Sequence, residues 1–282
     1  MYTVLKKKML APQITHLEVE APLIAKKRKP GNFVIVRANK KGERIPLTIV
    51  ETDMQRGSIT LIVQAIGKST YMINEMEAGD SFADVVGPLG QPTPIDHLGT
   101  VVCIGGGVGT AVVYPMTKSL KEAGNRVIGI IGARNKESVI LESEMDECTD
   151  ELYVTTDDGS YGLKGFVTDA LKKIMDSGET IHSVYTTGPL KMMKAVAGLT
   201  NDAGIHTLAS LNPIMMDGTG MCGACRVTVD GKLKFACVDG PEFNAHHINF
   251  DELTMRNNTY ADQEKMALNA FKKEQCKVED AQ

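Results

Sequence analysis

Three of the six cysteines gather in one short segment, with an aspartate shortly before them. Asp217, Cys222, Cys225 and Cys237 follow the spacing D-x4-C-x2-C-x11-C. Plant-type 2Fe–2S sites use C-x4-C-x2-C with a distant fourth cysteine, so the segment has that pattern with aspartate in first position. Small residues between the ligands let the backbone wrap closely around an inorganic core. The spacing therefore predicts a 2Fe–2S cluster held by one carboxylate and three thiolates.

Two other interpretations of this segment stay open at the level of sequence. A zinc site would take Cys or His as its fourth ligand, and His246 and His247 are near enough in the sequence to offer one. A redox-active dithiol pair at Cys222 and Cys225 would leave Cys237 without a role. No secretion signal is recognised, so a disulfide framework is not expected. The other cysteines are expected to be small buried or incidental residues: Cys103, Cys148 and Cys276.

A glycine-rich turn follows a predicted strand near the middle of the chain. Thr100–Ile104 is an apolar run typical of a buried strand, and a helix is expected from 110 to about 123. Between them stands Gly105-Gly106-Gly107-Val108-Gly109-Thr110. Glycine lets backbone N–H groups approach a pyrophosphate, and a helix N-terminus favours its negative charge. In this setting the turn predicts dinucleotide binding, with a tight structural turn as the alternative.

The second strand of this region ends without the acidic residue that usually contacts a ribose. Gly132-Ala133-Arg134-Asn135 stands there instead. Arg134 could accommodate a 2′-phosphate or stack on adenine, so NAD and NADP both stay open. Two later segments follow strands. The segment 187–193 (TGPLKMM) is either a ligand contact or only a helix start with proline near its first position, and 157–162 (DDGSYG) is either a lid over a nucleotide or a solvated loop.

A third candidate site lies in the N-terminal region. Arg44-Ile45-Pro46-Leu47-Thr48 precedes Gly67-Lys68-Ser69-Thr70. A fixed arginine can pair with a phosphate in a fork, and hydroxyl groups with backbone amides complete an anion site. Taken alone, the two segments read as a surface strand and a loop. No Ser-His-Asp or Cys-His pattern stands out, so no catalytic side chain is assigned and bound cofactors are expected to supply the chemistry.

Composition narrows the classes of function. The chain has 282 residues, 43% of them hydrophobic, with a net charge of −4 and no tryptophan. A nucleic-acid partner is not expected, because basic excess and stacking aromatics are both lacking. The uncharged stretch from His97 to Thr117 contains five glycines and a proline. A strand–turn–helix explains it better than a membrane span, so no membrane span is expected.

Patterning along the chain predicts the elements that must position these residues. Ile14–Glu20, Asn32–Arg37 and Ser58–Ala65 read as short strands between turns, which favours an antiparallel β-barrel. Val85–Pro92 is expected to be an exit loop. From about residue 98, strands alternate with helices, as in a doubly wound parallel α/β sheet. We therefore expect a β-barrel plus α/β fold with these parts: a barrel at 1–97, a nucleotide-binding domain at 98–211, a cysteine lobe at 212–250 and a helical tail at 251–282.

In this order, the motifs resemble those of the ferredoxin reductase-like flavoproteins. R-x-P-L-T, GGGVGTA, DDGSYGLKG, TTGPLKMM and D-x4-CGAC-x11-CVDGPEF all occur along about residues 1–250. The resembling branch holds the iron–sulfur electron-transfer subunits of dihydroorotate dehydrogenase and the small subunits of NADH-dependent ferredoxin:NADP+ oxidoreductase. Aspartate at position 217 favours the second group, because the dihydroorotate branch carries cysteine there.

The resemblance implies which residues bind which cofactor. FAD would be held by Arg44, Pro46, Leu47, Thr48, Gly67, Ser69 and Thr70. NAD(H) would be bound by Gly107, Val108, Gly109 and Thr110, with Asp157, Gly188 and Pro189 beside its nicotinamide half. The 2Fe–2S cluster would be ligated by Asp217, Cys222, Cys225 and Cys237. Thr187 stands where the family motif has cysteine, which weakens the expected nicotinamide contact at that position.

The implied activity is electron transfer between NAD(H), FAD and the cluster. The implied partner is a larger flavin and iron–sulfur subunit that binds NADPH and ferredoxin, in a heterodimer or a higher hetero-oligomer. Cluster chemistry favours a cytoplasmic location. The alternatives are an electron-transfer subunit of dihydroorotate dehydrogenase, a subunit of a sulfide or polysulfide reductase, and a zinc-bearing nucleotide-binding regulator.

Overall fold

The computed structural model describes residues 2–40 and 42–279, with side chains described as far as residue 275. Its N-terminal third forms two antiparallel sheets, in the orders β5-β6-β2-β1-β7 and β4-β3-β8. Their strands are β1 (Tyr2–Ala11), β2 (Ile14–Glu20), β3 (Phe33–Arg37), β4 (Ile45–Thr48), β5 (Glu51–Asp53), β6 (Ser58–Gln64), β7 (Ser81–Phe82) and β8 (Asp84–Leu89). Two short helices accompany the strands: α1 (Pro22–Lys27) and α2 (Lys68–Glu75).

The barrel core explains why these segments are strands. Alternate residues of β2 and β6 point inward, and Leu17, Ile59 and Leu61 are fully buried together with Val34 and Val36 of β3. The expected exit loop at 85–92 is wrong for most of its length, because β8 pairs with β3 along that segment. The two prolines and two glycines there suggested a loop, but backbone pairing with β3 outweighs that local signal.

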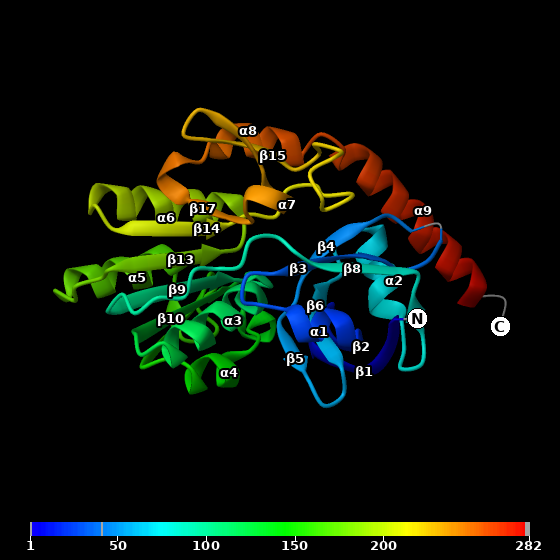
Figure 1. Cartoon of the computed structure of the whole chain (residues 1–282), viewed down its shortest axis with the longest axis horizontal. Helices are drawn as coiled ribbons and strands as arrows, with labels where there is room; N and C mark the ends of the chain where they lie inside the picture. Colours follow the sequence, from blue (N-terminus) through cyan, green and yellow to red (C-terminus); the bar gives the residue numbers. More distant parts are fainter. Residues whose placement is uncertain (1, 41, 280–282) are drawn as a thin grey trace.

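The second region is a mixed sheet in the order β12-β11-β10-β9-β13-β14-β17, parallel except for β17 (Figure 1). Its strands are β9 (Thr100–Gly106), β10 (Arg126–Ala133), β11 (Glu151–Thr156), β12 (Leu163–Lys164), β13 (Ser183–Thr187), β14 (His206–Ser210) and β17 (Glu242–Asn244). The helices are α3 (Gly109–Glu122), α4 (Glu142–Glu147), α5 (Val167–Asp176) and α6 (Leu190–Asp202), with a 3-10 turn at Lys136–Ser138. The chain runs outward from β9 in both directions, so the topological switch point lies between β9 and β13, where ligands bind in such sheets.

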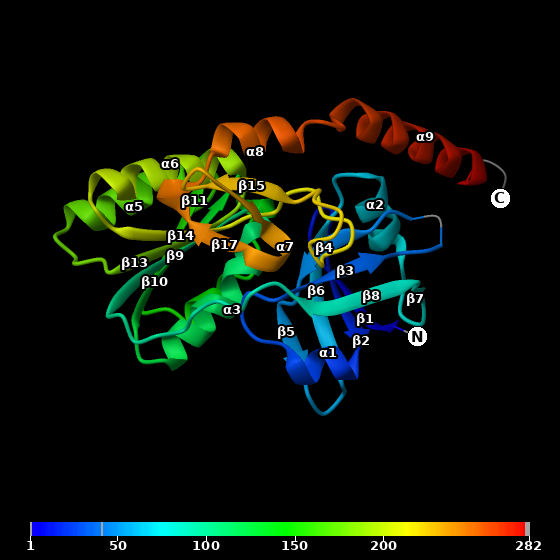
Figure 2. The ribbon, with the colours of Figure 1, turned by 45° about the horizontal axis from the view of Figure 1, so that its top comes forward.

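The cysteine segment lies over the junction of the barrel and the sheet (Figure 2). It contains β15 (Arg226–Val229), β16 (Lys232–Phe235), α7 (Ala236–Asp239) and a 3-10 turn at Ala245–His247. Two helices follow it in the chain, α8 (Phe250–Asn257) and α9 (Ala261–Glu279). β17 belongs to the same segment, but it pairs with β14 and forms the edge strand of the mixed sheet. The division into separate domains at 97, 211 and 250 stays a prediction.

Shared cores fix the three regions relative to one another. Phe33 and Ile35 of the barrel pack in one cluster with Cys225 and Cys237. Val50 of the barrel shares another cluster with residues of α3. Within the described part of the chain, no helix has the length and apolar character needed to cross a membrane.

Candidate cofactor and cluster sites

The glycine turn is pressed against the turn that follows β13. A Cβ on Gly109 would lie 2.4 Å from the carbonyl oxygen of Thr187, and one on Gly106 would lie 2.4 Å from the sulfur of Met192. Gly107 has φ +56°, a left-handed conformation that glycine adopts without strain, and open space faces its Cβ position. The two predicted turns therefore meet at the switch point, with Gly107 facing the open side.

The junction holds unused hydrogen-bonding groups. The hydroxyls of Thr110, Thr186 and Thr187 are buried without a hydrogen-bond partner. The amides of Val108 and Gly109 at the start of α3 add two donors, whereas the amide of Gly107 donates to the carbonyl of Gly132 at 2.7 Å and that of Thr110 to the carbonyl of Gly107 at 3.1 Å. The turn at 107–110 thus offers a pyrophosphate the amides of Val108 and Gly109 and the hydroxyl of Thr110.

Strand order places Asp157 on the other side of the glycine turn from Gly188 and Pro189. The amide of Asp157 donates to the carbonyl of Ala133 at 3.0 Å, and the amide of Asp158 donates to the carbonyl of Arg134 at 3.3 Å. β11 and β10 lie on one side of β9, whereas β13 lies on the other. Asp157 and the exposed Arg134 therefore lie on the β10–β11 side of the glycine turn, and the turn after β13 lies on the other side.

In the barrel, Arg44 stands exposed at the start of β4. Its guanidinium lies 3.2 Å from the carboxylate of Asp84, which also pairs with Arg37 at 2.6 Å. Exposed ion pairs of this kind contribute little to stability, so Arg44 can turn to a ligand at small cost. Pro46, Leu47 and Thr48 are half-buried on β4 and pair with β3.

The N-terminus of α2 is the matching anion site. The hydroxyl of Thr70 accepts hydrogen bonds from the amides of Ile66 and Gly67, at 2.9 and 3.0 Å. Thr70 therefore caps the helix, and its contact with a pyrophosphate stays a prediction. The hydroxyl of Ser69 donates to Glu43 at 3.0 Å, which ties this helix end to the segment carrying Arg44. The amides of Lys68 and Ser69 are the first two of the helix and remain available as donors.

The cysteine loop brings its predicted ligands together in two pairs. The Sγ atoms of the buried Cys225 and Cys237 lie 3.3 Å apart. One carboxylate oxygen of Asp217 accepts from the amide of Cys222 at 2.7 Å, and the other accepts from the amide of Thr219 at 2.8 Å. These amide bonds, that of Thr219 first, lower the pKa of Asp217 below its ordinary value. Burial and the neighbouring Cys225 raise the pKa of Cys237 to about 12, which the charge of a bound iron would reverse.

The donor set fits a two-iron cluster better than a single metal ion. Among the described residues, no group of three or more His, Cys, Asp and Glu side chains is arranged to hold one ion. A 2Fe–2S cluster needs two ligands for each iron, and the loop supplies two pairs. Gly218, Gly220 and Gly223 have φ of +74°, +83° and +64°, so the loop curls as a cluster cradle requires.

A zinc knuckle has less support. The Nε2 atom of His246 lies 3.0 Å from the hydroxyl of Thr200 on α6, so this ring is hydrogen-bonded away from the cysteines.

Two other cysteines lie apart from the loop. Cys103 and Cys148 are buried as expected, and burial raises their pKa to about 12 and about 11. The side chain of Cys276 lies outside the described residues.

Sequence reasoning missed one functional candidate, Glu242, which lies in the CVDGPEF tail of the cysteine motif. Its carboxylate accepts from the hydroxyl of Thr93 at 2.8 Å and lies close to Gly31. Burial raises the pKa of Glu242 to about 7. Nothing in the short tail singles out this carboxylate, and only the fold shows that Glu242 on β17 bonds to Thr93 in the segment that follows the barrel.

Two family models match the chain. The iron–sulfur cluster binding domain of dihydroorotate dehydrogenase B matches residues 212–249, and the oxidoreductase NAD-binding domain matches residues 103–198. These spans contain the cysteine loop and the glycine turn respectively.

Whole-chain relatives agree with these matches. A "dihydroorotate dehydrogenase B (NAD(+)), electron transfer subunit homolog" of Thermotoga maritima is 45% identical, over 96% of this chain and 95% of its own. The corresponding electron transfer subunit of Geobacillus thermodenitrificans is 32% identical, over 87% and 96%. A chain from the NADH-dependent reduced ferredoxin–NADP oxidoreductase structure superposes with a TM-score of 0.91 at 44% identity, covering 96% of this chain and 98% of that one. An Amycolatopsis cytochrome P450 reductase, 22% identical with a TM-score of 0.59, shares the fold, covering 71% of this chain and 65% of that one.

Proposed function

The chain belongs to the family of dihydroorotate dehydrogenase B electron transfer subunits, and from that premise we propose that its three sites form one electron path. It is an oxidoreductase subunit whose cofactors are NAD(H), FAD and an iron–sulfur cluster. The observation that carries the path is the contact between cluster loop and barrel. A Cβ on Gly218 would lie 2.5 Å from Leu89 and 2.8 Å from Ile35. The loop thus rests on the sheet that also contains the proposed FAD strand, β4.

The bound groups supply the redox chemistry: hydride exchange with NAD(H) at the flavin and single-electron transfer at the cluster. The protein's part is to bind and orient them. Arg44 would leave Asp84 to pair with the FAD pyrophosphate, and the amides of Lys68 and Ser69 would complete its binding. Thr48 and Leu47 would lie along the flavin side of β4. The close approach of Gly109 to Thr187 would hold the nicotinamide nucleotide against the same junction.

For the cluster, we assign one iron to Asp217 and Cys222 and the other to Cys225 and Cys237. The 3.3 Å approach of the two buried sulfurs supports the second pair. Cys222 is exposed whereas Cys225 is buried, so the first pair faces outward. This arrangement would let electrons leave toward a partner.

The partner would dock over the outer face of the cluster loop. Apolar side chains are unusually exposed there: Met221 is 89% exposed, Met216 58% and Val238 41%. Following the similarity to the ferredoxin–NADP oxidoreductase chain, we propose a larger flavin and iron–sulfur subunit that binds NADPH and ferredoxin. We also propose a cytoplasmic location for that complex.

A second candidate function, electron transfer to a dihydroorotate dehydrogenase, is favoured by the names of several relatives. Asp217 in place of a fourth cysteine favours the first candidate. Sulfide or polysulfide reduction is a further possibility that substrate screening would reveal.

The test is to purify the native complex anaerobically and to screen three reactions: reduction of NAD+ and oxidised ferredoxin by NADPH, reduction of NAD+ by dihydroorotate, and oxidation of NADH by polysulfide. Flavin bands with a broad iron–sulfur absorbance, both bleached by NADH, are expected from this subunit. Turnover with NADPH and ferredoxin supports the first candidate, and turnover with dihydroorotate alone replaces it by the second. A colourless, zinc-loaded protein would eliminate both.

A further inference from the structure

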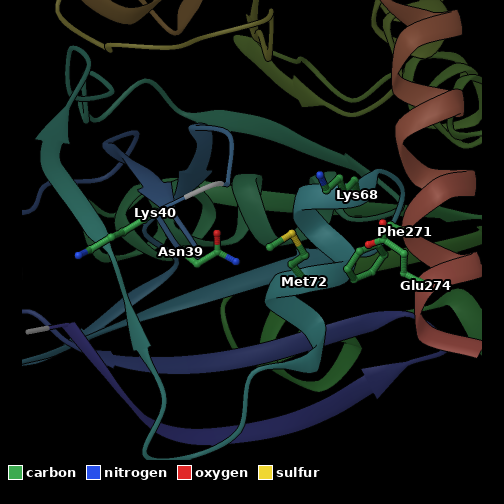
Figure 3. A pocket seen from close by; sticks show the side chains of 6 residues that line it. All are labelled: Asn39, Lys40, Lys68, Met72, Phe271 and Glu274. Carbon is green, nitrogen blue, oxygen red and sulfur yellow. The ribbon is translucent and has the colours of Figure 1, made fainter. Parts of the chain in front are cut away.

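An open pocket of about 510 Å³ lies between α2, α9 and the segment that follows β3 (Figure 3). Lys68 and Met72 reach it from α2, Phe271 and Glu274 from α9, and Asn39 and Lys40 from the third segment. A second pocket of about 300 Å³ shares Asn39, Met72 and Phe271 with the first. The size suits a nucleoside, since small-molecule sites span about 300–1,000 Å³.

Helix α9 is attached to the barrel by specific contacts with α2. The ammonium of Lys272 lies 4.5 Å from the centre of the Tyr71 ring. The amide of Gln275 donates to the carboxylate of Glu75 at 2.7 Å. Phe271 lies on the same helix just before these residues, so the two contacts hold its ring over α2 and define one wall of the pocket.

The pocket continues from the anion site at the N-terminus of α2. Lys68 is the first residue of α2 and also lines the pocket. Both views place α2 and α9 at the end of the molecule away from the parallel sheet (Figures 1 and 2). An FAD with its pyrophosphate at this helix end and its flavin toward the sheet therefore extends its other half toward α9.

We propose that α9 completes a binding pocket for the adenosine half of FAD, an inference that rests on the proposed function. Met72 and Phe271 offer apolar surfaces to the purine. The carboxylate of Glu274 accepts hydrogen bonds from the ribose hydroxyls or the exocyclic amine. Lys68 lies where the adenosine meets the pyrophosphate. Helix α9 is thus part of the cofactor site, although it begins more than 180 residues after α2 ends.

The experiment compares FAD with FMN, which has the flavin and one phosphate but no adenosine. Full-length protein is stripped of flavin and titrated with each compound, and binding is followed by flavin fluorescence. Phe271→Ala and Met72→Ala are each expected to weaken FAD binding about tenfold, as expected for a lost base–aromatic or apolar contact. FMN binding is expected to change less than about twofold on the same scale.

Met266→Ala is the matched control, because Met266 lies on α9 but is 72% exposed and lines neither pocket. It should leave both affinities unchanged. If the wild-type protein binds FAD while Phe271→Ala and Met72→Ala leave the FAD affinity intact, the adenosine pocket is disproved and the proposed function stands. Equal weakening of FAD and FMN also disproves it, because the substitutions then act through the barrel. A wild-type protein that binds neither flavin overturns the proposed function, and this inference with it.

Discussion

The Sγ atoms of Cys225 and Cys237 lie 3.3 Å apart, although β15, β16 and their connecting turn separate the two residues in the chain. The hairpin formed by these strands returns the chain to its start, since the amide of Ala236 donates to the carbonyl of Cys225 at 3.1 Å. The distance suits two thiolates on one iron. This pair is the structural basis of the cluster assignment.

Cys237→Ala should abolish the iron–sulfur absorbance and remove most bound iron, while FAD remains bound. The reason is that the removed thiolate leaves one iron with a single protein ligand. Iron analysis and visible absorbance measure both effects. Cys148→Ala is the control, because Cys148 is buried far from the loop in the nucleotide-binding region. Full iron content in Cys237→Ala would show that the cluster assignment is wrong.

Asp217→Cys should keep a cluster and shift its reduction potential and EPR signal, because a soft thiolate replaces a hard carboxylate on one iron. The structure also allows Asp217 to act only as an acceptor for the loop amides of Thr219 and Cys222. Asp217→Asn separates the roles, since an amide still accepts a hydrogen bond but binds iron poorly. A wild-type EPR signal and potential in both variants would exclude Asp217 as a ligand.

Gly109→Ala should weaken NADH binding at least about tenfold and lower the free energy of unfolding by about 1–3 kcal/mol. The added Cβ would lie 2.4 Å from the backbone oxygen of Thr187, so one of the two turns must move. NADH titration and thermal unfolding measure the two effects. Gly198→Ala is the matched control: it lies within α6 with open space around its Cβ position and should gain about 0.5–1 kcal/mol. Unchanged NADH affinity in Gly109→Ala would mean that the nucleotide binds elsewhere.

Glu242→Gln should make the stability less dependent on pH. The folded-state pKa of Glu242 is raised to about 7 from an ordinary value of 4.5 because the carboxyl is buried. Between these values the unfolded chain releases a proton that the folded protein keeps, so the free energy of unfolding falls as the pH rises from about 4.5 to about 7. The fall is at most about 3 kcal/mol. It levels off above that window.

Denaturant unfolding at pH 5 and at pH 8 measures this effect, with Glu264→Gln on the exposed face of α9 as control. The glutamine at 242 cannot ionise, so Glu242→Gln should gain stability relative to wild type at the higher pH. The same difference from wild type at both pH values would show that Glu242 titrates normally in the folded protein.

Local sequence patterns were enough to predict individual strands and to identify the cysteine and glycine motifs. The alternation in Ile14–Glu20 and the apolar run at Thr100–Ile104 predicted β2 and β9, because burial on one face or both leaves a local pattern. The cysteine spacing predicted the cluster motif that the family model matches. Glycines between a strand and a helix likewise marked the nucleotide turn, because the positive φ of Gly107 is a property of the local backbone.

The tertiary structure alone decided which of these segments meet. Three contacts join residues that are distant in the chain. Gly109 packs against Thr187, Thr93 donates a hydrogen bond to Glu242, and α9 packs on α2. The strand order also places Asp157, after β11, and Gly188, after β13, on opposite sides of β9. Such contacts depend on how the apolar faces of whole elements pack, and no short window of sequence contains that information.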